Sequence, residues 1–189
     1  MIVDFRLKKS DMAPLVINGE EVERVEFFKF LGTIVSDNFK WDRNTTGIVK
    51  KCHQRLFFLR KLKKFGICKI TLIQFYRAVI ESVLTFSITV WYGALTEADR
   101  DRLDKIVFTA SKIIGSKLET LEEIYKKRSE KKIQTIMSLP DHPSSQFFST
   151  LPSGRRFRSI LSRTDRFKNS FYVKSARDVR PKRSQPALC

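Results

Sequence analysis

The sequence has few of the residues from which metal and catalytic sites are built. Only two His occur among 189 residues, His53 and His142, and neither belongs to an HxD, HxxH or HExxH pattern. Two isolated His are too few for a zinc triad or for the two-His-one-carboxylate set of an iron dioxygenase. The G-x-G-x-x-G and P-loop patterns that hold methyl donors or nucleotide phosphates are also missing. We therefore expect no metal, no cofactor, no small-molecule substrate and no enzymatic activity.

Cysteine is equally scarce. Cys52, Cys68 and Cys189 are an odd number without CxxC spacing, which fits neither a disulfide framework nor a zinc site. The N-terminal stretch MIVDFRLKKSD lacks the apolar run of a signal peptide, so an intracellular location, nuclear or cytoplasmic, is expected. The most apolar stretch, 70–92, carries Arg77 and Glu81 near its middle, where each charge would cost roughly 3 kcal/mol in lipid. It predicts a buried helix rather than a membrane span.

Acidic residues are also in short supply, and the basic ones are concentrated. The chain has 37 Lys and Arg against 20 Asp and Glu, a net charge of +17. The stretch 41–64 holds eight basic residues against Asp42, and 155–183 holds eleven against Asp165 and Asp178. Such an excess is commonly offset by a polyanion. Nucleic acid is the first candidate and an anionic membrane surface the second.

The first forty residues predict extended structure. Asn18-Gly19, a type I′ turn signal, separates Leu15–Ile17 from Glu21–Val25, which predicts a hairpin exposed on one face. Phe27–Val35 predicts a longer strand. Gly32 inside it indicates a bulge or a close backbone approach.

From about residue 45 the apolar period becomes helical. Helices are predicted over 45–64, 70–92, 96–115 and 121–137. The second is apolar nearly all round, as in the central element of a bundle, and its Arg77 and Glu81 are expected to pair. The first has a single apolar stripe made of Ile48, Cys52, Leu56, Leu59 and Leu62.

Together these patterns predict an α+β fold that is mainly α. A hairpin region over 1–40 precedes a four-helix unit over 41–139. Beyond Pro140 the periodicity fades, and 140–189 is expected to be a basic tail rich in Pro, Arg and aromatics, largely irregular and partly disordered.

An ordered string of motifs carries a family resemblance. PLVINGEEVERVEFFKFLG, KKCHQRLFFLRKLKKFG, FYRAVIESVLTFSITVWYG and LPSGRRFRS resemble the region downstream of the palm in LINE-type, non-LTR retrotransposon reverse transcriptases, up to about Tyr172. The resemblance implies palm and primer-grip strands at Met1–Phe5 and Phe27–Val35, followed by a thumb and connection. It also implies a non-catalytic C-terminal piece, because the [F/Y]-x-D-D aspartate pair that holds two metal ions is missing. The same segment is similar to the domain labelled as the N-terminal domain of the eighth AlkB homologue.

Two basic stretches are the candidate sites. On the helix 45–64 the outer basic residues have no acidic residue four positions away, so their charges are unpaired and suited to phosphates. The competing interpretation is a solvated helix face. Trp41, Trp91, Phe57 and Phe58 are expected in the core or against the hairpin rather than as stacking platforms. The helix residues expected to contact nucleic acid are Lys50, Lys51, Arg55, Arg60, Lys61, Lys63 and Lys64.

The tail alternates Arg with Phe157, Phe167, Phe171 and Tyr172, which suits stacking on single-stranded bases. Its competing interpretations are a disordered arm or a localisation signal at Arg180–Arg183. The tail residues expected to contact nucleic acid are Arg155, Arg156, Arg158, Arg163, Arg166 and Lys168.

The leading hypothesis is contact with RNA or DNA that does not depend on sequence and weakens steeply with salt. Two alternatives stay open. One is a helical module that docks on an unknown protein partner. The other is an AlkB-type protein with RNA- or DNA-modifying activity, as a methyltransferase or 2-oxoglutarate dioxygenase, that this segment itself could not carry.

Overall fold

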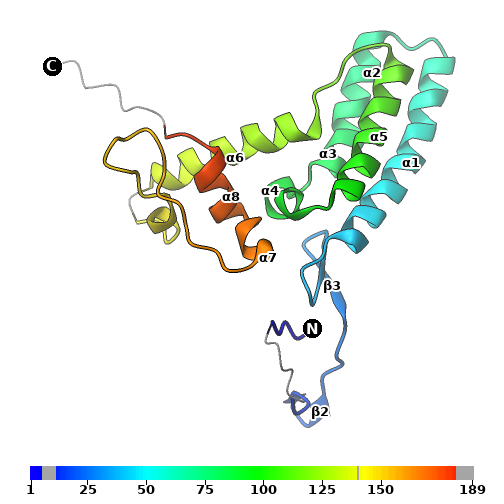
Figure 1. Ribbon diagram of the computed structural model, residues 1–189. Helices are drawn as coiled ribbons and strands as arrows, with labels where there is room; N and C mark the ends of the chain where they lie inside the picture. The colour runs from blue at the N-terminus through cyan, green and yellow to red at the C-terminus, as the bar shows by residue number, and fades with distance from the viewer. Residues whose placement is uncertain (6–11, 140, 182–189) are drawn as a thin grey trace.

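A computed structural model describes residues 1–5, 12–139 and 141–181. Three long helical rods stand side by side, two hairpins extend from one end of them, and a further helix leads away to a second, smaller group of helices (Figure 1). The predicted α+β fold, mainly α, is confirmed. None of the helices in the described ranges is long and apolar enough to cross a membrane.

The first hairpin forms where the turn signal predicts it. β1 (Val16–Ile17) pairs antiparallel with β2 (Glu20–Glu21), with Val16 opposite Glu21. Asn18 and Gly19 both have positive φ, 52° and 83°, as a type I′ turn requires. Both strands are exposed. Residues 1–5, which the family resemblance assigned to a palm strand, form no strand.

The single strand predicted over Phe27–Val35 is wrong. The stretch folds into a second hairpin, β3 (Phe27–Phe30) and β4 (Thr33–Ser36), with Phe28 opposite Val35. Leu31 and Gly32 turn the chain at φ 45° and 89°. The predicted close approach at Gly32 is confirmed, because a Cβ there would lie 3.2 Å from the ring of Phe86.

The bundle begins with α1 (Asp42–Lys64), three residues before the predicted start. Its predicted stripe is confirmed: Ile48, Cys52, Leu56 and Leu59 are buried, and Leu62 packs partly buried against the same core. A helix of this length presents a second, outward face along its whole axis. That face holds most of the predicted basic residues, whereas Arg55 is half-buried.

The second predicted helix is interrupted. α2 (Lys69–Phe75) continues as a π-helix, η1 (Tyr76–Glu81), and as α3 (Ser82–Leu84). It then stops at Thr85, and Ser87 takes φ 50° before α4 (Ile88–Trp91) and η2 (Tyr92–Ala94). Arg128, far along the chain, donates to the carbonyl and the Oγ1 of Thr85, the latter at 2.8 Å, and so satisfies the backbone that the break exposes.

Two further expectations for this stretch fail. It is not buried all round, since the side chains of Ile70 and Val90 are exposed. Arg77 and Glu81 form no ion pair within the described structure. Burial raises the pKa of Glu81, and the charge of Arg77 offsets only part of that effect.

The next two helices match their predictions. α5 (Glu97–Ile114) starts at Thr96, whose Oγ1 accepts the Asp99 N–H at 3.2 Å, and ends at Gly115 with φ 74°. α6 (Leu121–Met137) has the predicted bounds, and Thr120 and Glu123 form a capping box at its start.

α6 begins in the core shared with the other long helices and then leaves it. Leu121 and Tyr125 of α6 lie in the core of the bundle, whereas Ile133 and Ile136 belong to a second apolar cluster. Figure 1 shows α6 running away from α1 and α5. The second cluster also contains Phe148, Phe157 and Ala176, which come from η3 (Ser145–Phe148), from the following loop and from α8 (Phe171–Asp178). The short helix α7 (Asp165–Lys168) precedes α8 and contacts it. The expected irregular tail is thus packed against α6 as far as the structure describes it. Residues 182–189 lie outside the described chain.

Candidate functional site

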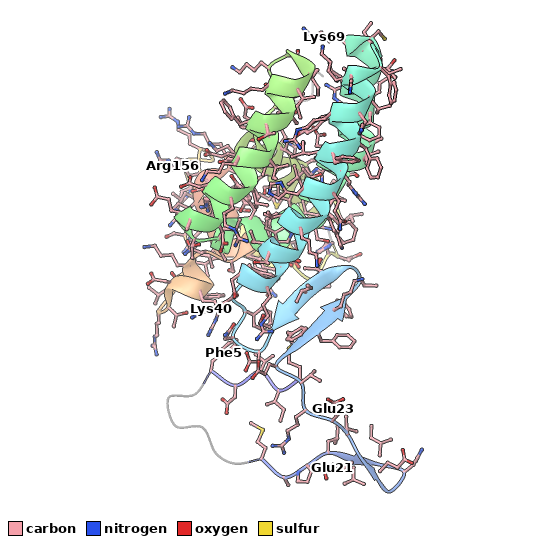
Figure 2. The ribbon with its side chains drawn as sticks, turned by 90° about the vertical axis from the view of Figure 1, so that its right-hand side faces the viewer. Phe5, Glu21, Glu23, Lys40, Lys69 and Arg156 are labelled. Carbon is pink, nitrogen blue, oxygen red and sulfur yellow. The ribbon has the colours of Figure 1, made fainter. Side chains whose placement is uncertain are left out.

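The outer face of α1 carries a line of cations. Lys50, Lys61 and Lys64 are exposed and follow one another at spacings of eleven and three residues, which places them on one side of the helix. From the first to the last this line measures roughly 21 Å at 1.5 Å per residue. That length corresponds to about six phosphates of one duplex strand at 3.4 Å each. Figure 2 shows α1 beside α5, above the hairpins.

The predicted α1 cations lack acidic partners. Among described side chains, ion pairs form elsewhere: Arg43 with Glu26 at 3.1 Å, Arg102 with Asp99 at 3.1 Å, and others on α6 and α8. None of those pairs includes a predicted site residue of α1. Exposed and unpaired ammonium and guanidinium groups are available to an external anion. The exposed members of the set are Lys50, Lys51, Arg60, Lys61, Lys63 and Lys64.

Arg55 differs from the rest of this set. Its side chain is half-buried and one of its nitrogens donates to the carbonyl of Val79 in the π-helix η1. Burial raises the pKa of the adjacent Cys52 thiol to about 11, and the nearby charges of Arg55 and Lys51 offset part of that rise. Arg55 therefore both anchors α1 to the neighbouring rod and contributes positive charge at the junction between them.

Two aromatic side chains on α1 were expected in the core or against the hairpin and are instead exposed. Phe57 and Phe58 are 53% and 56% exposed and contact each other edge to face, with ring centroids 5.7 Å apart. The ammonium of Lys61 lies 5.4 Å from the centre of the Phe57 ring. Phe57 follows Ile48 by nine residues, or two and a half turns, so the helical period itself places it opposite the core. By contrast, Trp41 and Trp91 are buried as predicted.

The tail cations are exposed too, on a different part of the molecule. Arg155 and Arg156 lie on a loop held by a hydrogen bond from the Leu151 N–H to the Arg156 carbonyl at 2.9 Å. The guanidinium of Arg166 lies 3.2 Å from the centre of the Phe5 ring. In Figure 1 the loop with Arg155 and Arg156 lies beyond α6, away from α1, whereas α7, which carries Arg166 and Lys168, lies on the side of the hairpins. The tail cations are therefore not gathered in one place. The remaining exposed members of the tail set are Arg158, Arg163 and Lys168.

The tail aromatics are mostly core residues, which corrects their predicted role as stacking platforms. Phe157 is buried, and Phe171 and Tyr172 pack partly buried around Phe148, whose ring centroid is 5.6 Å from that of Phe157. Only Phe167 among the four has a substantially exposed ring. The segment Arg180–Arg183 extends past the described residues.

The structure also bears on metal binding. Within residues 1–5, 12–139 and 141–181, no three His, Cys, Asp or Glu side chains gather in a way that could hold a metal ion.

Tyr92, which lies under Arg100 with 4.8 Å between the guanidinium and its ring, has its pKa raised to about 12 by burial. It is a packing residue of the bundle.

Comparison with known proteins finds similarity to a protein family. The family model of the N-terminal region of alkylated DNA repair protein alkB homolog 8 matches residues 41–82, under a quarter of the chain. The matched stretch starts at Trp41 and covers α1, α2, η1 and the first residue of α3. No curated protein and no solved structure matches this sequence significantly.

Proposed function

We propose that this chain is a non-catalytic nucleic-acid-binding module that grips the phosphate backbone with the outer face of α1. The observation that carries the proposal is the row of exposed α1 cations without acidic partners among the described side chains. A rigid helix holds those cations at fixed intervals, so several phosphates of one strand can be neutralised together. Contacts of this kind position a nucleic acid without reading its sequence.

Two sequence relationships support this proposal. The matched stretch of the alkB homolog 8 family, described as a DNA repair protein, contains all the predicted α1 cations. The motifs that resemble LINE-type reverse transcriptases place α1 in the thumb, and we propose such an origin for the chain. In this proposal the catalytic aspartates of that family have no counterpart in the 189 residues, and the module contributes grip alone.

The exposed aromatic rings of α1 should make binding prefer one form of nucleic acid over another. Phe57 lies between the lysines on the outer line, and Phe58 lies against it. An unstacked base can lie on such a ring, whereas a paired base in a duplex cannot reach it. The proposed module should therefore favour single strands or strand ends over uninterrupted duplex.

The test is binding of the purified chain to a labelled duplex, a single strand and an RNA hairpin by fluorescence anisotropy at several salt concentrations. We expect micromolar or tighter binding to all three at low salt, with an affinity that falls steeply as salt rises. Phe57→Leu should weaken single-strand binding more than duplex binding, and Phe108→Leu, an exposed aromatic on α5, serves as its matched control. Lack of binding at low salt would refute the proposal.

A second candidate is docking on a protein through the β3–β4 hairpin. All four residues of β3 are exposed, including Phe28 and Phe30, and Leu31 at the turn is 79% exposed. Exposed apolar strands are potential pairing surfaces for another chain. Phe28→Ser with Phe30→Ser should abolish self-association or partner capture if this surface docks, and should leave nucleic-acid affinity unchanged.

A further inference from the structure

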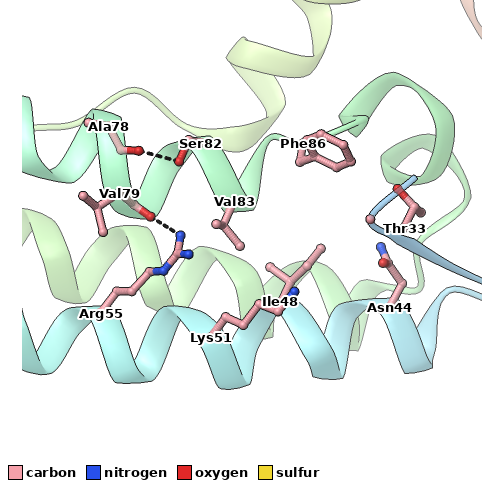
Figure 3. A pocket seen from close by; sticks show the side chains of 11 residues that line it. Thr33, Asn44, Ile48, Lys51, Arg55, Ala78, Val79, Ser82, Val83 and Phe86 are labelled. Atoms are coloured by element: carbon pink, nitrogen blue, oxygen red, sulfur yellow. Dashed lines mark hydrogen bonds between the residues drawn. The ribbon is translucent and has the colours of Figure 1, made fainter. Parts of the chain in front are cut away.

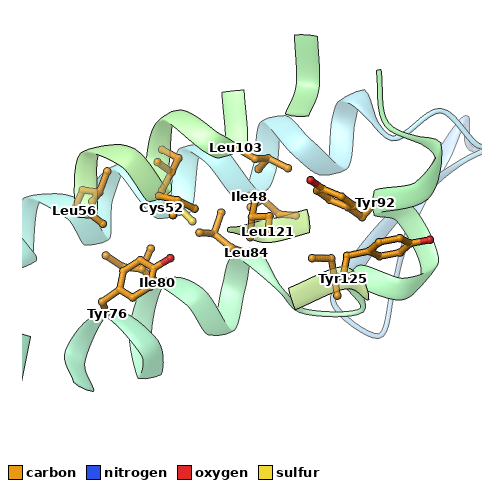
Figure 4. Packing of buried hydrophobic residues seen from close by; sticks show 14 of the residues in the cluster. Ile48, Cys52, Leu56, Tyr76, Ile80, Leu84, Tyr92, Leu103, Leu121 and Tyr125 are labelled. Carbon is orange, nitrogen blue, oxygen red and sulfur yellow. The ribbon is translucent and has the colours of Figure 1, made fainter. Parts of the chain in front are cut away.

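A cavity of about 500 Å³ lies between three elements that are separate in the sequence. α1 forms its floor, η1 and α3 form the opposite wall, and the β3–β4 turn closes one end next to Phe86 (Figure 3). Its lining is divided into two parts. Ile48, Val83 and the Phe86 ring make an apolar half, while the cationic side chains of α1 lie further along. Ile48 also belongs, with Cys52, to the core of the bundle (Figure 4).

Asn44, one of the lining residues, holds the β3–β4 hairpin against α1. Its Oδ1 accepts the backbone N–H of Ile34 at 3.1 Å, which fixes the orientation of the amide. Its Nδ2 then has no partner, although the side chain is only 4% exposed. A buried amide donor without an acceptor costs about 1–3 kcal/mol.

The charges around the cavity are of one sign. Lys51 and Arg55 line it, and no Asp or Glu of the described chain does. Arg55 uses one guanidinium nitrogen for the Val79 carbonyl, which leaves its other N–H groups for a ligand. The π-helical turn places that carbonyl, together with the Ala78 carbonyl that accepts from Ser82 Oγ at 2.6 Å, on the cavity wall. Both carbonyls already accept a hydrogen bond, so the charges of Lys51 and Arg55 determine what this end favours, which is an anionic group.

We propose that the cavity binds one nucleotide unit, with its phosphate on Lys51 and Arg55 and its base against the apolar half. The volume lies within the range of about 300–1,000 Å³ found for small-molecule sites, which is far more than a phosphate alone needs. This inference rests on the proposed function, because it assigns a single flipped-out nucleotide to the same helix, α1.

Mononucleotides test the site directly. Adenosine and uridine monophosphates, titrated into the full chain and followed by NMR, should bind at least tenfold more tightly than inorganic phosphate. Ala78→Trp fills the cavity from an exposed position and leaves both cations in place. It should weaken mononucleotide binding at least tenfold. Gln74→Trp, exposed on α2 and outside the lining, is the matched control and should change nothing.

Equal affinity for phosphate and nucleotide, or unchanged nucleotide binding by Ala78→Trp, would overturn the inference. Oligonucleotides then separate the two sources of the nucleotide. If it belongs to a strand, Ala78→Trp should lower single-strand affinity by roughly tenfold, the order expected from one buried base, and leave duplex affinity unchanged. If it is free, only mononucleotide binding should fall. Failure of the unmodified chain to bind duplex, with mononucleotide binding intact, would refute the α1 grip and leave the cavity assignment standing.

Discussion

Neutralising the outer line of α1 gives the sharpest test of how this chain holds a polyanion. The change is Lys50→Gln, Lys61→Gln and Lys64→Gln together, three exposed side chains without an ion-pair partner among described residues. Loss of the contact between one lysine and one phosphate should make the slope of log affinity against log salt less steep by about 0.9. Removing all three lysines should therefore flatten the slope by about 2.7.

That change in slope is large enough to measure. Between 50 and 200 mM salt, a slope smaller by about 2.7 means that the affinity ratio across this range shrinks by roughly 40-fold. Anisotropy titrations with a duplex at four or more salt concentrations give both slopes directly. The melting temperature should stay the same, because none of the three side chains packs in the core or forms a described ion pair.

A matched variant removes the same charge elsewhere. Lys117→Gln, Lys131→Gln and Lys132→Gln are exposed positions on α6 and on the loop before it, so the net charge falls equally from +17 to +14. If binding depended on net charge alone, both triple variants would flatten the slope equally, and the special role of α1 would be refuted. Lys→Arg at the three α1 positions should retain the slope.

Individual packing and hydrogen-bonding interactions give further expected outcomes. Gly93→Ala should destabilise the fold by roughly 1–3 kcal/mol in urea unfolding, because its Cβ would lie 2.9 Å from the backbone oxygen of Asn169. Thr120→Ala removes the side-chain cap of α6 and should lower the free energy of unfolding by about 1 kcal/mol in the same assay. Thr120→Ser retains the hydroxyl and should keep most of that stability. The thiols can be compared in a variant in which Cys189 is replaced. There Cys68 should react with iodoacetamide at a pH below its ordinary pKa of 9.0, because a hydrogen bond from the Thr71 hydroxyl lowers that pKa. Cys52, buried and with a pKa raised to about 11, should react only on unfolding, and equal rates for the two thiols in the native chain would contradict the structure.

Local signals made the long helices predictable. The bounds of α6 follow from its apolar period and from Pro140 beyond its end, and the start of α5 follows from Thr96 and Asp99. These features involve residues within one or two turns of each other, so the sequence contains the whole cause.

The breaks depend on distant partners and could not be predicted in the same way. Thr85–Ser87 contains neither Gly nor Pro, and its irregular backbone is stabilised by Arg128, 43 residues away. The β3–β4 turn places Leu31, a residue with a side chain, at φ 45°, so the apolar run around it looked like one strand.

The candidate site likewise has one part that local sequence predicts and one part that depends on distant residues. The unpaired cations of α1 could be predicted because they lie on one helix with a known period. The cavity could not, since Asn44, Arg55, Val83 and Phe86 converge only after two rods and a hairpin pack together. The exposure of Phe57 was within reach of the sequence, because its position on the helical wheel is opposite Ile48.

The sharing of α6 between two apolar clusters sets an order for folding on the ribosome. The core of the three rods needs Leu121 and Tyr125, whose ring lies 5.1 Å from that of Tyr92, so it stays open until the first turns of α6 emerge. At about 5–20 residues per second, the delay after the end of α5 is roughly one second. Once those turns dock, the rest of the same helix holds Ile133 and Ile136 ready for Phe148 and the later residues. The two apolar clusters should therefore form in the order in which their residues are synthesised. The first half of α6 completes the first cluster, and its second half begins the second.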